Sequence, residues 1–296
     1  MRLAAVSMLV CGAVSAQTWQ EAAKTRIAAF PGEVSLYAKN LDTGAAFGIR
    51  ENDPVRTAST IKLPVLCAVH DLVSAGKAKW TDLMTVRAAD KVSGSGIIGS
   101  EISDGVELPL RDVTNLMMVL SDNTATNMVL ERFTADAVNA YLDRIGIRTT
   151  RSMRKVRGDG TVLKEAEGWS AAGRLPENQK YGIGRSTPRD MVTILERLDK
   201  GEIVSPRDSA EVLEVMKRCQ DSDGVRRKLQ GVIIANKTGA LDALRSEVAL
   251  VYSKGGKIAI AITVDGMAKP DWSPDNPGSL LIAGLAPMLV EGLAKK

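Results

Sequence analysis

Residues 57–73 read TASTIKLPVLCAVHDLV, an apolar segment that begins with Ser59 three positions before Lys62. On a helix this spacing puts the hydroxyl and the amine on one face, within hydrogen-bonding reach. A neutral lysine can then serve as the base that a serine nucleophile needs. The N-terminal end of a helix also favours a developing anion. The segment predicts a buried helix that starts at a nucleophile, although a plain helix cap is the alternative role for Ser59.

The same Ser-x-x-Lys spacing occurs twice more, in contexts that favour other roles. Ser74 and Lys77 enclose Gly76 and end an apolar run, which predicts a helix terminus. Ser152 and Lys155 lie in RSMRKVR, which predicts a solvated basic stretch. Of the three pairs, the one that opens residues 57–73 is therefore the candidate for catalysis.

The chain ends predict strands. Residues 18–30 predict a short amphipathic helix, and residues 34–52 predict a hairpin around Asp42-Thr43-Gly44. After residue 231 the runs VIIANKTG, EVALVYS and KIAIAITV predict three strands, the last two joined through Gly255-Gly256. A final helix follows, with a kink expected at Pro287.

The middle of the chain, about residues 58–221, has a helical pattern. Its apolar residues recur at helical spacing, and one helix is predicted to start at Ser186-Thr187-Pro188 and to stop at Gly201. The predicted fold class is therefore α/β (α+β). An antiparallel sheet flanked by helices forms an α/β lobe, about 17–57 and 222–296, and an all-helical lobe is inserted into it. We expect the site in the cleft between the lobes.

Composition excludes several classes of function. The chain has 296 residues, 45% hydrophobic and 25% charged, with a net charge of +4 that is too mild for nucleic acid as a partner. The single histidine, His70, lies about 16 Å along the helix from Ser59 at 1.5 Å per residue, so we interpret it as a helix residue. With one histidine and three cysteines, neither a metal site nor a cofactor is expected.

The first sixteen residues predict a signal peptide. Arg2 precedes an apolar stretch, and small residues at 14–16 favour cleavage after Ala16. The stretch is too short to span a bilayer, so we expect an exported protein, periplasmic or secreted, with no membrane span after processing. Lipidation at Cys11 and an uncleaved anchor are the alternatives. The mature chain keeps Cys67 and Cys219, which could pair in an oxidising compartment or remain two buried thiols.

Two further motifs carry polar chemistry. Ser121-Asp122-Asn123 lies at a break between two predicted helices, where the alternative reading is ordinary capping. Lys237-Thr238-Gly239 ends a predicted strand, where an ammonium and a hydroxyl could bind a carboxylate and glycine would let a substrate backbone approach. The alternative there is a plain turn with a solvated lysine.

In this order, on a helix, a helix corner and a strand, the three motifs resemble the signature of the class A β-lactamases and the related penicillin-binding proteins. The resemblance extends over most of the mature chain. It implies that Ser59 is the acylated nucleophile and Lys62 its proton partner. It also implies that Ser121 passes a proton to the departing lactam nitrogen, and that Lys237 helps to keep Lys62 neutral.

The resemblance also implies a set of substrate-binding groups. Asn123 would contact the substrate amide, while Thr238 and the neighbouring lysine would hold the substrate carboxylate beside Gly239. The backbone N–H groups of Ser59 and Ala240 would form the oxyanion hole. Arg245 is a further candidate for the carboxylate, with a solvated strand-edge arginine as the alternative.

One motif of the class A β-lactamases is missing. The family loop Arg-x-Glu-x-x-Leu-Asn, whose glutamate activates the deacylating water, has no counterpart in residues 145–187. Glu165, Glu167 and Glu177 are present there outside any motif, and the first two are our candidates for this base. Gly184 stands roughly where the family has an aspartate that holds the loop.

The resemblance predicts a monomeric serine β-lactamase that hydrolyses the β-lactam amide through a Ser59 acyl-enzyme. The missing glutamate motif leaves two alternatives open. One is a penicillin-binding enzyme that acts on D-alanyl peptides or esters and deacylates slowly, and the other is a non-catalytic penicillin sensor. The expected partner is a small β-lactam or a D-alanyl peptide, and the lifetime of the acyl-enzyme separates the three.

Overall fold

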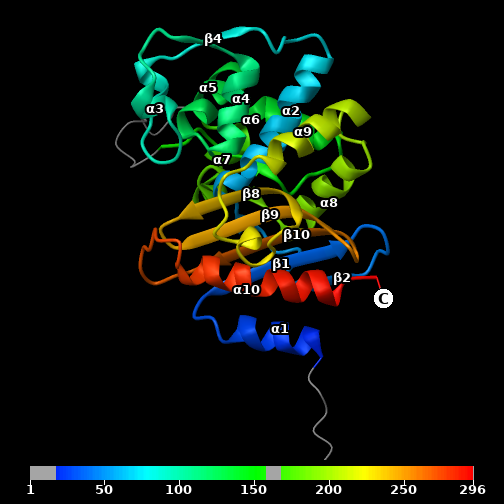
Figure 1. The fold of residues 1–296 in the computed structure, drawn as a ribbon. Coiled ribbons are helices and arrows are strands. Elements are labelled where there is room, and N and C mark those ends of the chain that lie inside the picture. The colour runs from blue at the N-terminus through cyan, green and yellow to red at the C-terminus, as the bar shows by residue number, and fades with distance from the viewer. Residues whose placement is uncertain (1–17, 158–167, 296) are drawn as a thin grey trace, which may run out of the picture.

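A five-stranded antiparallel sheet with helices on both faces organises the protein (Figure 1). The computed structural model describes residues 18–157 and 168–295. The predicted signal peptide therefore lies outside the described residues and stays a prediction. In spatial order the strands are β2 (Ala46–Ile49), β1 (Glu33–Asn40), β10 (Gly256–Asp265), β9 (Leu244–Ser253) and β8 (Ile233–Leu241).

Both ends of the chain build this sheet, as the sequence predicted. β1 pairs with β10 along its whole length, from Glu33 opposite Asp265 to Asn40 opposite Ile258. The turn between β1 and β2 and the tight turn before Gly256 confirm the two predicted hairpins. The predicted α/β fold with an inserted helical lobe is confirmed.

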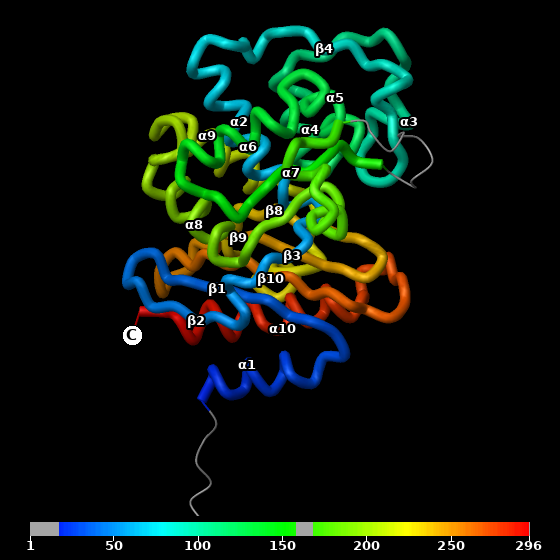
Figure 2. The backbone as a smooth tube through the Cα atoms, turned by 180° about the vertical axis from the view of Figure 1, so that it is seen from behind, coloured from blue at the N-terminus to red at the C-terminus, as the bar shows by residue number. Residues whose placement is uncertain are grey.

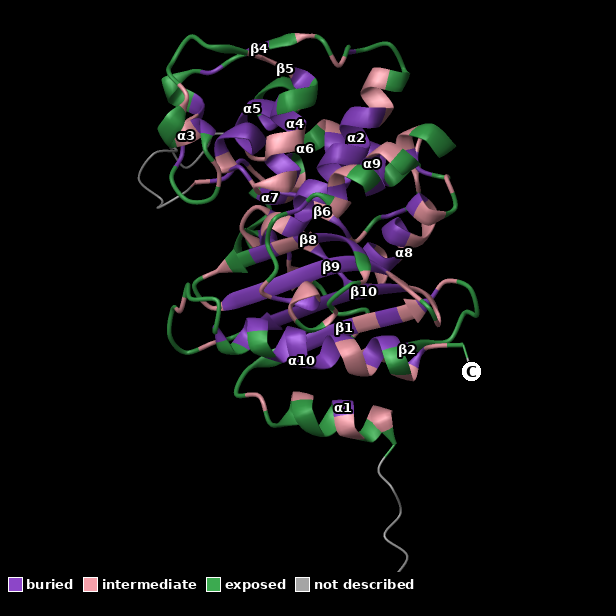
Figure 3. Ribbon diagram, viewed as in Figure 1, coloured by how far each residue is buried: buried purple, intermediate pink, exposed green. Residues whose placement is uncertain are grey.

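The central strands are buried on both sides, which explains their continuous apolar runs. On β9, Val248 and Leu250 belong to the core under the helical lobe, while Ala249 and Val251 belong to a second core. The second core is covered by α10 (Pro277–Gly292), with α1 (Trp19–Ala28) beyond it (Figures 1 and 3). The sheet thus separates two apolar cores.

The inserted part of the chain forms the helical lobe, which is also visible from behind in Figure 2. Its helices are α2 (Lys62–Ser74), α3 (Ile98–Glu101), α4 (Leu110–Val119), α5 (Asn123–Phe133), α6 (Ala135–Arg144), α7 (Ala171–Arg174), α8 (Pro188–Asp199) and α9 (Pro206–Lys217). The prediction of a continuous helical pattern was wrong in detail, because four short strands interrupt it: β4 (Leu83–Thr85), β5 (Glu107–Pro109), β6 (Arg151–Ser152) and β7 (Gly184–Ser186). A further short strand, β3 (Val55–Arg56), precedes the lobe and pairs with β7. Strands of two or three residues carry too little periodicity to be read from sequence.

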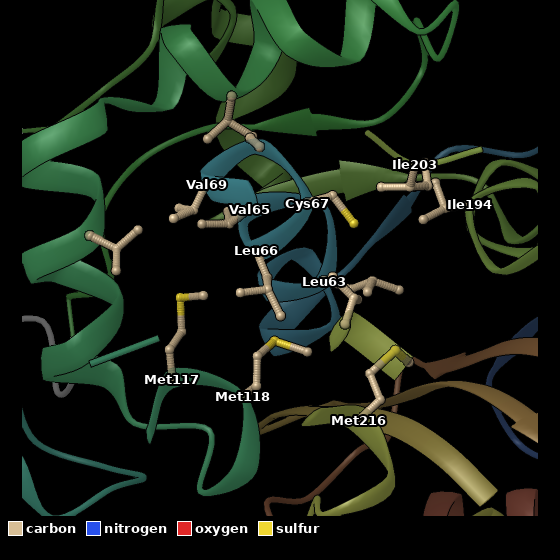
Figure 4. Close-up of a cluster of buried hydrophobic side chains, with 14 of the residues drawn as sticks. Leu63, Val65, Leu66, Cys67, Val69, Met117, Met118, Ile194, Ile203 and Met216 are labelled. Atoms are coloured by element: carbon tan, nitrogen blue, oxygen red, sulfur yellow. The ribbon is translucent and has the colours of Figure 1, made fainter. Parts of the chain in front are cut away.

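Helix α2 lies in the middle of the lobe. All of its residues from Lys62 to His70 are buried, as is expected of a helix that is apolar on every side. Its side chains, such as Leu66, pack against side chains from α4, α8 and α9, including Met117 and Met216 (Figure 4). This packing fixes the place of the lysine at the start of α2.

Several local predictions can be compared with the structure. Thr187 caps α8 and Ser205 caps α9, each followed by proline, and α2 ends at Ser74 as its glycine suggested. Cys67 and Cys219 are both free and buried, so they are two separate thiols. The interpretation of RSMRKVR as solvated was wrong, because Ser152 is fully buried and Lys155 is buried and paired with Glu131.

Candidate active site

A cavity of about 770 Å³ lies between the two lobes. Its lining brings together most of the predicted site residues: Ser59, Ser121, Asn123, Lys237, Thr238, Gly239 and Ala240. They come from three parts of the chain that are far apart in sequence, namely the start of α2, the α4–α5 corner and β8.

Ser59 lies on a 3₁₀ turn, Ala58–Ile61, that leads directly into α2. Ala58 before it has a positive φ of 45°, a strained conformation that is frequent at functional sites. Strand β8 passes very close to this turn. A Cβ added to Gly239 would lie 2.7 Å from the carbonyl oxygen of Thr57 and 2.9 Å from the nitrogen of Ser59. Only glycine therefore allows β8 to approach the nucleophile this closely.

The amine of Lys62 is fully buried beneath the cavity. Among the described residues it donates to the Ser121 carbonyl oxygen at 2.7 Å, to Asn123 Oδ1 at 3.0 Å and to Ser121 Oγ at 3.3 Å. Burial, reinforced by the charge of Lys237, holds the pKa of Lys62 well below its usual value, while Asp122 opposes the shift. A lowered pKa makes the neutral amine, the form that can accept a proton, more readily available.

The α4–α5 corner is held by Asp122. This buried carboxylate accepts hydrogen bonds from the backbone N–H groups of Ile97 at 2.7 Å, Ile98 at 2.9 Å and Ala125 at 2.8 Å. The capping role that sequence suggested is therefore correct for Asp122. Ser121 beside it has a φ of 55°, which turns its side chain and carbonyl toward the lysine amine.

The Lys237 amine is also buried, and it donates to the Thr238 carbonyl oxygen at 2.8 Å. Burial lowers the pKa of Lys237, and the nearby Cys219, Asp221 and Glu247 oppose that shift. The Thr238 hydroxyl donates to Asp221 Oδ2 at 2.7 Å. Sequence reasoning missed Asp221, which lies in the loop after α9 and lines the cavity.

The structure does not bring Arg245 to the cavity. Its guanidinium donates to the carbonyl oxygens of Leu241 and Leu244, each at 2.7 Å, and to that of Asp271. It also stacks on Trp272, with 4.9 Å from Cζ to the ring centroid. The residue is only 8% exposed, so the solvated alternative is wrong as well. Arg245 stabilises the β8–β9 turn.

The wall from residues 150–185 supplies no glutamate to the described cavity lining. Glu165 and Glu167 lie outside the described residues, and Glu177 is exposed and does not line the cavity. The described lining from this loop consists of Arg154, Val156, Arg157 and Ile183. Gly184 is part of β7, where its carbonyl oxygen accepts from the backbone N–H of Thr57.

Two asparagines that sequence reasoning missed fix this wall. Asn127 on α5 donates to the Val156 carbonyl oxygen at 3.0 Å and accepts from its N–H at 2.8 Å. Asn139 on α6 makes the same pair of bonds to Ser152, at 2.9 and 2.8 Å. Both are buried. Each side-chain amide pairs with the backbone N–H and C=O of one loop residue, as a neighbouring β-strand would. An asparagine on the apolar face of an amphipathic helix was the available signal.

A buried carboxylate, Glu247 on β9, fixes the loop after α9. It accepts from the side-chain amide of Asn236 at 2.7 Å and from the N–H of Val225 at 2.8 Å. Burial raises the pKa of Glu247 to about 7. A Cβ on Gly224 would lie 1.9 Å from Glu247 Oε2, so only glycine allows the loop to pass this close to the carboxylate.

Other expectations concern groups outside the cavity. His70 accepts or donates a hydrogen bond at 2.9 Å with Asp208 and packs edge-on against Trp80, which confirms it as a helix residue. Within residues 18–157 and 168–295, no cluster of three or more potential metal ligands occurs. No helix in the same ranges is long and apolar enough to cross a bilayer.

The chain is similar to a set of known proteins. The sequence model of the β-lactamase enzyme family matches residues 18–293. A β-lactamase of Rhodobacter capsulatus is 24% identical over 235 residues, 77% of this chain and 73% of that protein. The β-lactamase regulatory protein BlaB of Streptomyces cacaoi is 24% identical over 271 residues, covering 81% and 86%.

Solved structures give the same result. The β-lactamase from Sphaerobacter thermophilus DSM 20745 has a TM-score of 0.78 at 26% identity, covering 93% of this chain and 96% of that chain. A single-residue mutant of PBP-A, in an acyl-enzyme complex with penicillin G, has a TM-score of 0.76 at 26% identity, covering 92% and 95%.

The asparagine contact gives a testable prediction. Asn127→Leu removes both hydrogen bonds to Val156 and leaves two buried backbone groups unpaired, so we expect a loss of about 2–5 kcal/mol in the free energy of unfolding. Urea denaturation measures it from the shift in midpoint at unchanged slope. The control Asn52→Leu alters an exposed asparagine whose side-chain hydrogen bond from Arg189 can be replaced by water, so it should cost at most about 1 kcal/mol. Equal losses in the two variants would contradict the role of Asn127.

Proposed function

The chain belongs to the β-lactamase enzyme family, and from that premise we propose a serine β-lactamase that hydrolyses the β-lactam amide through an acyl-enzyme on Ser59. The observation that carries the proposal is the buried amine of Lys62. It has a lowered pKa and is hydrogen-bonded to Ser121 beside the cavity that Ser59 lines. These are the conditions under which a lysine can act as a base for a serine.

Acylation follows from this arrangement. Lys62 takes the proton of Ser59 as Oγ attacks the lactam carbonyl carbon, and the backbone N–H groups of Ser59 and Ala240 stabilise the resulting oxyanion. When the carbon–nitrogen bond breaks, the lactam nitrogen takes a proton from the hydroxyl of Ser121. Ser121 regains one from Lys62, to which it is hydrogen-bonded. The lysine ends neutral, and the product is an ester on Ser59.

Substrate recognition uses the groups around the nucleophile. Asn123 accepts from Lys62 and donates to the Ser93 carbonyl oxygen, and its amide nitrogen carries a second hydrogen for the substrate amide. Gly239 and Ala240 present the backbone of β8 to the substrate. We propose that Lys237 and Thr238, which line the cavity at the end of β8, hold the substrate carboxylate.

Deacylation needs a base for the attacking water. In the described part of the cavity lining the acidic residues are Asp221 and Asp242, without a glutamate. For the β-lactamase we propose Glu165 or Glu167, which lie outside the described residues, as this base, with a differently held water as the alternative. The same observation favours a second candidate function, a penicillin-binding enzyme for D-alanyl peptides or esters with a long-lived acyl-enzyme. The likeness to PBP-A supports this candidate too.

Intact mass spectrometry of residues 17–296 mixed with benzylpenicillin tests the proposal. We expect an adduct of one penicillin on the wild-type protein and none on Ser59→Ala, because the nucleophile is lost. A transient adduct with accumulating penicilloate identifies a β-lactamase, and an adduct that lasts for hours identifies the second candidate. An adduct on Ser59→Ala, or none on the wild type, would overturn the Ser59 mechanism.

The loop wall gives a second prediction. Val156 lines the cavity and Asn127 fixes its backbone, so a carboxylate introduced there extends from a fixed point of the cavity wall. The background is the double variant Glu165→Gln, Glu167→Gln, which lacks both candidate bases. In it we expect Val156→Glu to raise the deacylation rate at least tenfold, which is less than the factor of about 100 or more that a well-positioned base contributes. Decay of the adduct in the mass spectrum measures the rate. The control Val156→Gln has the same size without a base, and equal rates for Glu and Gln would refute the idea.

A further inference from the structure

An exposed tryptophan lies at the edge of the cavity between the lobes. Trp272, in the loop between β10 and α10, is 64% exposed and belongs to the cavity lining. A large aromatic side chain that stays in contact with water beside a cavity is typical of a contact with a ligand. The acylation steps described above do not use this ring.

The ring of Trp272 rests on a buried cation. The guanidinium of Arg245 stacks on it, with 4.9 Å from Cζ to the ring centroid. Arg245 is itself fixed, because it donates to the carbonyl oxygens of Leu241 and Leu244, each at 2.7 Å. With Arg245 only 8% exposed, the exposed surface of Trp272 comes from the parts of the ring that face away from this guanidinium.

The loop that carries Trp272 is tied down on both sides of the ring. The side-chain amide of the buried Asn276 donates to the Asp271 carbonyl oxygen at 2.7 Å. The backbone N–H of Met267 donates to the Ala243 carbonyl oxygen at 3.1 Å, which attaches the start of the loop to the β8–β9 turn. A ring that is held in place before binding loses little conformational entropy when a ligand stacks on it.

Asp221 relates the ring to the Thr238 end of the site. Its carboxylate accepts from the Thr238 hydroxyl at 2.7 Å. Burial lowers the pKa of Arg245, and the carboxylates of Asp271 and Asp221 oppose that shift. Asp221 therefore lies near both the Thr238 hydroxyl and the guanidinium on which Trp272 stacks. A substrate whose carboxylate is held at Thr238 would have the tryptophan ring beside the substituent next to that carboxylate.

From these contacts we propose that Trp272 is a specificity-determining residue that stacks on a planar aromatic substituent beside the substrate carboxylate. The inference rests on the proposed function, in which Lys237 and Thr238 hold that carboxylate, and it narrows the substrate class. The preferred acyl donors are β-lactams with an aromatic or heteroaromatic ring next to the carboxylate. Those with a small aliphatic substituent there bind less tightly.

The physical reason is the burial and stacking of two flat apolar surfaces. A ligand ring that covers Trp272 removes apolar surface of both partners from water. Offset stacking of two aromatic rings adds to the effect of the buried area. Together these contributions are large enough to change the dissociation constant about tenfold.

Nitrocefin and cephalothin form a matched pair of probes. Both carry the same thienylacetamido group and the same carboxylate, but nitrocefin has a dinitrostyryl group where cephalothin has an acetoxymethyl group. In the Ser59→Ala background, where no acylation interferes, calorimetry measures both dissociation constants with and without Trp272→Ala. We expect the affinity for nitrocefin to fall about tenfold and that for cephalothin to change less than about twofold.

Two further variants serve as controls. Trp272→Phe keeps an aromatic ring at the same place and should retain most of the affinity for nitrocefin. Ile233→Ala removes a side chain of β8 that is 61% exposed and lies outside the described cavity lining, so it should change neither dissociation constant.

An unchanged affinity for nitrocefin in Trp272→Ala, or an equal loss for both probes, would overturn the inference and leave the proposed function intact. If neither probe bound to the parent Ser59→Ala variant, the proposed function would be contradicted and the inference with it.

Discussion

The buried amine of Lys62 and its hydrogen bonds to the α4–α5 corner are the interaction on which the rest of the site depends. A lysine without exposure to water is costly to keep charged, and here a second buried lysine, Lys237, adds to that cost. The structure accommodates the amine by turning the Ser121 carbonyl and the Asn123 side chain toward it. That corner is strained at Ser121 and is stabilised by the three backbone bonds to Asp122.

The two lobes meet in a way that places β8 against the nucleophile. Strands β1 and β10, from the two ends of the chain, pair in one sheet. In that sheet β8 is the edge strand, next to β9. Gly239 then lets the strand lie against the turn that carries Ser59. The packing around α2 sets the other side of the contact (Figure 4). A cavity with groups from both lobes results from these long-range contacts.

The sequence predicted those parts of the site at which the proposed chemistry allows only a few types of residue. The motifs at residues 59, 121 and 237, the proline-started helices and the sheet from both ends all have local patterns, and the structure agrees with them. Arg245, the Ser152 segment and Asp221 were misjudged or missed because their roles depend on partners distant in sequence. Arg245 donates to the Asp271 carbonyl oxygen, and Asn139 is hydrogen-bonded to the backbone of Ser152. Asp221 accepts from the Thr238 hydroxyl. The deacylating group stays a prediction, since Glu165 and Glu167 lie outside the described residues.

The most direct test of the account is the titration of Lys62, followed by NMR of protein labelled with ¹³C at lysine Cε. Lys62→Met identifies its resonance. Only the neutral amine can take the Ser59 proton, so acylation should increase as the pH rises through the pKa of Lys62. The account predicts that this pKa lies well below that of the exposed lysines and rises when Lys237 is replaced by methionine. A Lys62 resonance that titrates together with the exposed lysines would contradict the account.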